Sequence, residues 1–232
     1  MDKIGPICRS VEDCVHVFEV IYGPDGKDTT VVYLPFNWTA DVQLADLRIG
    51  YLKSAFDEVD EFHALHQEAL RTLTSLGAKL IPIELPAYPV EALNFVLSAE
   101  AAAAFDELTR SDRDDLLARQ VKDAWPNVFR QACFIPAVEY LQANRVRRML
   151  MEAMQNRMST IDVYVAPSFG GTSLLLTNLT GHPAVVCPNG VGENGKPCSL
   201  TFTGQLYQEA AILAVARQYQ VATGFHLLNP PL

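Results

Sequence analysis

The residues best placed to do chemistry form the short run GGTS, which covers residues 170–173. The run follows a buried-looking apolar stretch, and serines stand at Ser168 and Ser173. A glycine loop at the carboxyl end of a strand, opening a helix, can present backbone N–H groups to an anion or an oxyanion. The competing interpretation is a tight strand-to-helix turn that needs glycine for its backbone angles. The run matches neither G-x-S-x-G nor G-x-x-x-x-G-K-[ST], so the residues alone favour the tight turn and predict no cofactor.

Two histidines, His63 and His66, stand three residues apart in a segment rich in acids. This spacing puts both rings on one face of a helix, where they could begin a metal site. H-E-x-x-H is absent, however, and no third ligand stands nearby. We therefore interpret the pair as part of a solvated helix face, and the sequence predicts no metal site. The remaining histidines are isolated in sequence from any paired Ser, Cys or Asp, and they indicate no triad: His16, His182 and His226.

A basic cluster is formed by Arg145, Arg147 and Arg148 within one long helical segment. Three guanidinium groups could hold a carboxylate or an RNA phosphate. In a chain with a net charge of −9, pairing with the protein's own acids is the better prediction. Residue chemistry alone therefore yields no catalytic set.

The composition narrows the class of protein. The chain has 232 residues, of which 49% are apolar and 19% charged, enough to bury a real core. Its acidic balance argues against nucleic acid or an anionic membrane as a partner. Five scattered cysteines without a C-x-x-C pair are typical of reduced thiols in a cytoplasmic protein. No apolar run approaches the roughly 20 residues that a membrane span needs.

The elements that must position these residues begin with a helix that Ser10 can cap. Residues 29–45 read as an irregular connection. A strand at 47–52, a helix at 60–77 and a strand at 78–86 then form a βαβ unit, which predicts a parallel pair with a right-handed crossover.

The second half of the chain continues the alternation. Residues 89–158 read as mostly helical and end in one long helix at 136–158. After them we expect strands at 162–167, 183–188 and 198–204, with a hairpin turn at 189–197 between the last two. A terminal helix is expected at 206–223. The predicted class is α/β, with a mixed, mostly parallel sheet covered by helices in a single domain over residues 1–232.

Several stretches, taken together and in order, resemble the amidase signature family. They are DKIGPICRSVEDCVHVFEVIYGPDGKD, LRIGYLKSAFDEV, LGAKLIPIELP, DVYVAPSFGG, NLTGHPAVVCPNG and KPCSLTFTGQLYQEAAILAVARQYQVAT. The resemblance extends over almost the whole chain, and it implies the C-terminal half of an amidase-signature fold.

The resemblance also implies a reaction, the hydrolysis of carbon–nitrogen (amide) bonds. Family members use a serine nucleophile, a second serine on a cis peptide and a lysine that shuttles protons. Those residues lie upstream of the family segment that begins here at Gly5, so we expect no catalytic residue in this chain, and no activity of the chain alone. By resemblance, the residues that approach a small amide substrate are Ser168, Phe169, Gly170 and Gly171, with Phe134 and Tyr140 on the acyl side.

Three alternatives stay open at this point. The chain is part of an amidase completed by an N-terminal half, a non-catalytic relic or binding module, or a fragment of the A subunit of a glutamine-dependent transfer-RNA amidotransferase. In the last branch the resemblance implies an acidic residue seven positions before Asn178, where this chain has Gly171. Glycine cannot bind the ammonium group of glutamine, so the sequence favours a general amidase. Half a sheet would also leave a strand edge exposed, which predicts a homo-oligomer or aggregation.

Overall fold

The computed structural model describes residues 1, 3–193 and 195–229. Five strands form one mixed sheet in the order β2-β1-β3-β5-β4. Their bounds are Ile49–Leu52 (β1), Leu80–Ile83 (β2), Val163–Pro167 (β3), Ala184–Val191 (β4) and Pro197–Gly204 (β5). β1 pairs in parallel with β2 and β3, whereas β5 is antiparallel to both β3 and β4. The predicted class, the parallel βαβ pair and the terminal hairpin are thereby confirmed, although Asn194 of the hairpin lies outside the described residues.

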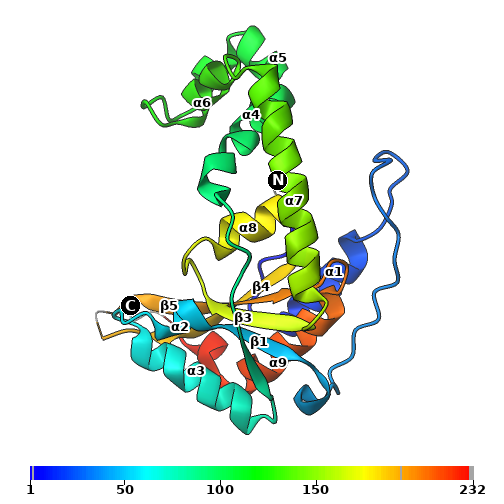
Figure 1. Ribbon diagram of the computed structural model, residues 1–232, viewed down its shortest axis with the longest axis vertical. Coiled ribbons are helices and arrows are strands. Elements are labelled where there is room, and N and C mark those ends of the chain that lie inside the picture. Colours follow the sequence, from blue (N-terminus) through cyan, green and yellow to red (C-terminus); the bar gives the residue numbers. More distant parts are fainter. Residues whose placement is uncertain (2, 194, 230–232) are drawn as a thin grey trace.

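The helices lie on both faces of the sheet (Figure 1). Their bounds are Val11–Ile21 (α1), Lys53–Asp57 (α2), His63–Ser75 (α3), Phe95–Ala104 (α4), Asp106–Arg110 (α5), Trp125–Ala132 (α6), Ala137–Met158 (α7), Ser173–Thr180 (α8) and Glu209–Thr223 (α9). Short 3₁₀ helices occur at Leu44–Asp46, Val90–Leu93, Arg113–Leu116 and Phe225–Leu227.

Two apolar clusters hold these layers together. One joins α1, α3 and α9 to the sheet and includes Val15, Leu73 and Phe202. The other joins α7 and α8 to the opposite face and includes Met154 and Tyr164. All five residues of β3 are buried, as expected for a central strand covered on both faces.

The first helix begins as the sequence predicts. The backbone N–H of Asp13 donates to Ser10 Oγ at 3.1 Å, and Ser10 Oγ donates to the Asp13 carboxylate at 2.7 Å. The capping box therefore satisfies one of the unpaired N–H groups of the first turn.

A small helical lobe stands away from the sheet. The 22 residues of α7 extend about 33 Å at 1.5 Å per residue, so its N-terminal half reaches beyond the sheet. Helices α4, α5 and α6 lie around that far end (Figure 1). The ring of Phe129 stacks on Phe105 and Trp125, with ring centroids 5.1 and 5.6 Å apart.

The connection after α1 has neither helix nor strand over residues 23–43. It forms an extended strap that runs out from the body of the molecule and returns to β1 (Figure 1). The prediction of an irregular connection over residues 29–45 is confirmed, apart from the 3₁₀ turn that begins at Leu44.

Candidate functional site

The loop between β3 and α8 is held against the sheet at the carboxyl end of β3. The backbone N–H of Ser168 donates to the Ser199 carbonyl at 3.0 Å. The Ser168 hydroxyl contacts the hydroxyl of Thr201 on the neighbouring strand β5 at 2.9 Å. Ser168, the first residue of the loop, is therefore held by hydrogen bonds to β5, and residues 169–171 continue away from the sheet.

Backbone geometry explains the glycines of this loop. A Cβ atom at Gly170 would lie 3.1 Å from the Pro167 carbonyl oxygen, closer than nine in ten such contacts, so a side chain there would require the backbone to shift by a few tenths of an ångström. Gly171 has φ +56°, in the left-handed region that favours glycine. The tight-turn interpretation of GGTS is thus confirmed for the backbone.

Phe169 is the unusual residue of the loop. It has φ +63° without being glycine, and its side chain is 86% exposed. A large aromatic residue is uncommon in this conformation, which costs free energy. The loop therefore presents an exposed apolar ring at the carboxyl end of β3.

Ser173 is turned inward and does not serve as a free hydroxyl. Its Oγ lies 3.0 Å from the Tyr164 hydroxyl, and both side chains are buried. Burial raises the pKa of Tyr164, so the phenol stays protonated at neutral pH. No base lies within hydrogen-bond reach of Ser173 among the described residues, and the contact fastens the start of α8 to β3.

Phe134 and Tyr140 lie elsewhere. Phe134 is 85% exposed just before α7, and Tyr140 is half-buried in the first turn of that helix. This end of α7 is the one away from the sheet (Figure 1). The structure brings Ser168, Phe169, Gly170 and Gly171 together at the carboxyl end of β3 and leaves the two aromatic residues in the helical lobe.

The interpretation of His63 and His66 as a solvated face is wrong for one of them. His66 is 4% exposed, with the rings of Phe56 and Phe62 beside it, and its Nε2 lies 3.4 Å from Cys198 Sγ at the start of β5. His66 Nδ1 lies 3.8 Å from a carboxylate oxygen of Asp60. Burial lowers the pKa of His66 and raises the pKa of Cys198, so this pair is neutral at pH 7.

A β-bulge completes this buried polar cluster. The register shifts between Pro188 and Val191, and the bulge turns Asn189 inward. Asn189 donates to Cys198 Sγ at 3.6 Å and accepts a hydrogen bond from the Tyr219 hydroxyl. Sequence spacing could not reveal this Cys-His-Asp arrangement, since its members come from α3, β5 and the turn before α3.

Two of the three arginines pair with the protein's own acids as predicted, whereas Arg145 contacts the amide oxygen of Gln142 at 3.4 Å. Arg147 donates to the Leu179 carbonyl at 2.7 Å and lies 3.3 Å from Glu100, while Arg148 pairs with Glu152 at 2.7 Å. Among the described residues there is no group of three or more His, Cys, Asp or Glu side chains suited to a metal ion. In the same part of the chain, every helix is too short or too polar to span a bilayer.

The chain resembles proteins of known class in sequence. The family model Amidase matches residues 1–177. The A subunit of the glutamyl-tRNA(Gln) amidotransferase of Acinetobacter baylyi is 28% identical over 97% of this chain, and its counterpart in Legionella pneumophila is 26% identical over 99%. The chain covers 55% and 57% of these two proteins, so it spans about half the length of the curated relatives it matches.

Solved structures show the same fold. A bacterial aryl acylamidase of the amidase signature family superposes with a TM-score of 0.77 at 20% identity, over 98% of this chain and 55% of that protein. An amidase family protein from Bacillus anthracis superposes with a TM-score of 0.75 at 19% identity, over 98% of this chain and 49% of that protein. The fold and the family match agree, and the chain belongs to the amidase family.

Proposed function

We propose that this chain is the C-terminal part of an amidase that hydrolyses carbon–nitrogen bonds, and that the nucleophile is supplied from outside its 232 residues. The match of residues 1–177 to the amidase family carries the proposal. The chemistry of the serines supports it, because no described serine hydroxyl bonds a lysine or a histidine. Ser54 bonds Glu84, Ser168 bonds Thr201 and Ser173 lies against Tyr164.

In this proposal the β3–α8 loop forms one wall of the substrate pocket. Phe169 supplies an exposed apolar ring, and Gly170 and Gly171 let the backbone approach a small amide closely. Such a wall orients the acyl group, while the nucleophile and its base act from the opposite side. Phe134 and Tyr140 contribute to the acyl side only if another segment brings the helical lobe to the pocket.

The test compares two preparations. The recombinant 232-residue chain is assayed on simple aliphatic and aromatic amides, beside the native protein isolated from its source and analysed by intact mass. We expect hydrolysis only from native material that contains additional polypeptide. Turnover by the recombinant chain that is lost in Ser173→Ala contradicts an external nucleophile, and the absence of hydrolysis in native material favours a relic or binding module.

A second candidate, the A subunit of a glutamine-dependent amidotransferase, is favoured by the names of the curated relatives. Gly171 argues against it, because the resemblance expects an acid there to bind the ammonium group of glutamine. Glutamine and a simple amide are therefore compared as substrates of the native material. Release of ammonia from glutamine in clear preference to other amides would establish this second candidate.

A further inference from the structure

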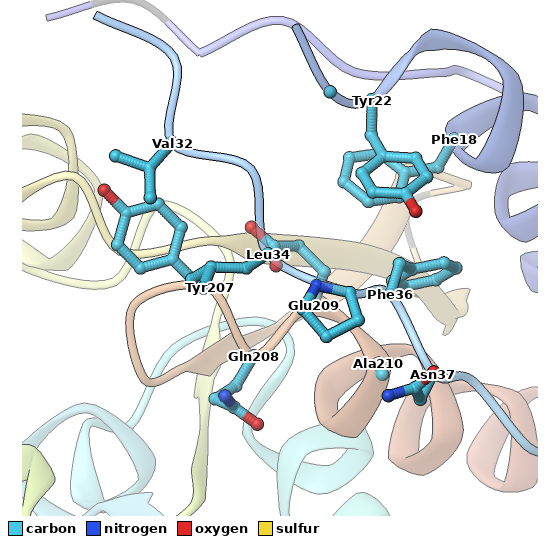
Figure 2. Close-up of a pocket in the computed structure, with 12 residues that line it drawn as sticks. Phe18, Tyr22, Val32, Leu34, Phe36, Asn37, Tyr207, Gln208, Glu209 and Ala210 are labelled. Atoms are coloured by element: carbon cyan, nitrogen blue, oxygen red, sulfur yellow. The ribbon is translucent and has the colours of Figure 1, made fainter.

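A cavity of about 500 Å³ lies at the opposite end of β5 from the β3–α8 loop. Three segments far apart in the sequence line it: the end of α1, the strap, and the turn that leads into α9. Figure 2 shows Phe18 and Tyr22 on one side, and Tyr207 and Glu209 across from them. Its volume is in the range typical of small-molecule sites.

Aromatic rings make up much of its wall. Phe18 and Phe36 meet edge to face with ring centroids 5.0 Å apart, and Tyr22 lies 5.8 and 5.9 Å from these two rings. Tyr207, in the turn before α9, has φ +63° and lies beside Val32, with Leu34 and Glu209 between it and the other rings (Figure 2). Phe18 and Tyr22 stack with their ring planes 20° apart, and Tyr22 stacks in turn on Tyr33 at 16°, so these rings cover one another's faces and form an apolar aromatic wall.

Glu209 is the charged residue among those that line the cavity, so the charge there is negative. Glu209 is half-buried in its wall, and no lysine, arginine or histidine is among the residues that line the cavity. No ion pair to Glu209 occurs among the described residues, whereas Glu12 on the neighbouring helix pairs with Arg217 at 2.6 Å. Glu209 lies in the first turn of α9, and its side chain places a negative charge beside the rings.

We propose that this cavity is a binding site for a small organic cation of the amine or quaternary ammonium class, held by the Glu209 carboxylate within a wall that includes the Phe18, Tyr22, Phe36 and Tyr207 rings. A neutral molecule of the same shape would gain the apolar contact but not the ion pair. The strap, which supplies Val32, Leu34 and Phe36, closes one side of the site. The site is separate from the β3–α8 loop, so it does not depend on the proposed hydrolysis.

The test uses two probes of matched shape, choline and its uncharged isostere 3,3-dimethylbutan-1-ol. Binding to the 232-residue chain is followed through the NMR shifts of fluorine-labelled tyrosines, which report Tyr22 and Tyr207 directly. We expect saturable shifts with choline and roughly threefold or more weaker binding of the isostere, which cannot form the ion pair. Equal binding of the two probes, or no saturable shift with choline, overturns the proposal.

Variants assign the effect to the site. Glu209→Gln should weaken choline binding by roughly threefold or more, as loss of a partly exposed ion pair predicts. Glu91→Gln removes the same charge from an exposed position outside the cavity and should leave binding unchanged. Tyr22→Leu should weaken choline binding, whereas Tyr22→Phe, which keeps the ring, should bind choline as tightly as the parent chain. Unchanged affinity in folded Glu209→Gln, checked by circular dichroism, overturns the role of the carboxylate.

Discussion

At the scale of single residues, Ser173 combines a tempting sequence position with a buried structural role. Its hydroxyl lies 3.0 Å from that of Tyr164, and the contact joins β3 to α8. We expect Ser173→Ala to lower the free energy of unfolding by about 1–2 kcal/mol, because a buried phenol loses its partner. Urea denaturation measures the loss, and Tyr164→Phe combined with Ser173→Ala should recover part of it. A Ser173→Ala variant of unchanged stability would contradict this role.

His182 makes the stability of the protein depend on pH. Thr180 Oγ1 donates to the Leu176 carbonyl at 2.9 Å, so it accepts from His182 Nδ1–H at 2.8 Å. Burial, together with the charge of Lys3, lowers the pKa of His182 from 6.5 to about 4. The folded pKa lies below the ordinary value, so this stabilisation is present above pH 6.5 and is lost as the pH falls toward 4.

The expected loss from His182 on acidification is at most about 3 kcal/mol. Urea denaturation at about pH 7 and about pH 4.5 measures it, and His182→Gln should lose less stability between the two pH values than the parent chain. His16→Gln, at an exposed site, is the matched control and should behave as the parent does. Carboxylates such as Asp162, whose pKa Arg48 lowers through a side-chain hydrogen bond, contribute equally in all three proteins. Equal acid sensitivity of His182→Gln and the parent contradicts the assignment.

The cysteines should differ in reactivity according to burial. Cys133 is exposed, whereas Cys187 and Cys198 are buried. Burial raises the pKa of Cys187 to about 12, and burial also raises that of Cys198, so few thiolates form at pH 8. A chromogenic disulfide reagent should modify Cys133 at least about tenfold faster than either buried thiol, with the Cys133→Ser variant as the control. Fast labelling of Cys198 in the folded chain would instead indicate a thiol activated by His66.

At the scale of elements, α9 packs tightly on β5 at Gly204. A Cβ atom at Gly204 would lie 2.7 Å from Ile212 Cγ2, a distance that real structures essentially never show. We expect Gly204→Ala to cost about 1–3 kcal/mol of unfolding free energy, because the helix must shift on the sheet. Gly5→Ala is the control, since nothing lies within 4 Å of its added Cβ. Thermal denaturation of both variants measures the difference, and equal melting temperatures would show that α9 adapts without cost.

The elements were predictable where local patterns decide them. Apolar spacing and the Ser10 cap predicted α1, and the strand–helix–strand pattern predicted the parallel pair of β1 and β2. The environment of His66 was not predictable, because Cys198, which contacts it, is 132 positions away. The cavity beside Glu209 was not predicted for the same reason. Its lining comes from α1, the strap and the turn before α9, which meet only in the folded chain, and the strap carries no periodic pattern.

The candidate site was predictable in part. The resemblance and the glycine run indicated the β3–α8 loop, and the positive φ of Gly171 agrees with that prediction. The separation of Phe134 from this loop follows from the length of α7, which depends on how the helical lobe packs. Whether the loop and the two aromatic residues contact a substrate stays a prediction.

At the scale of the whole molecule, β2 and β4 are the two edge strands of the sheet. β4 has eight residues, and Val186 and Val191 on it are 61% and 52% exposed. A long edge strand with exposed apolar residues pairs readily with another chain, and a lysine on such a strand opposes that pairing. We therefore expect the 232-residue chain to associate as its concentration rises, and Val186→Lys to shift the equilibrium toward monomer.

Analytical ultracentrifugation measures the association of both proteins. Val20→Lys, which places the same charge on an exposed site of α1, is the control and should leave association unchanged. A parent chain that stays monomeric at all concentrations, or a Val186→Lys variant that associates as the parent does, contradicts a role for the β4 edge.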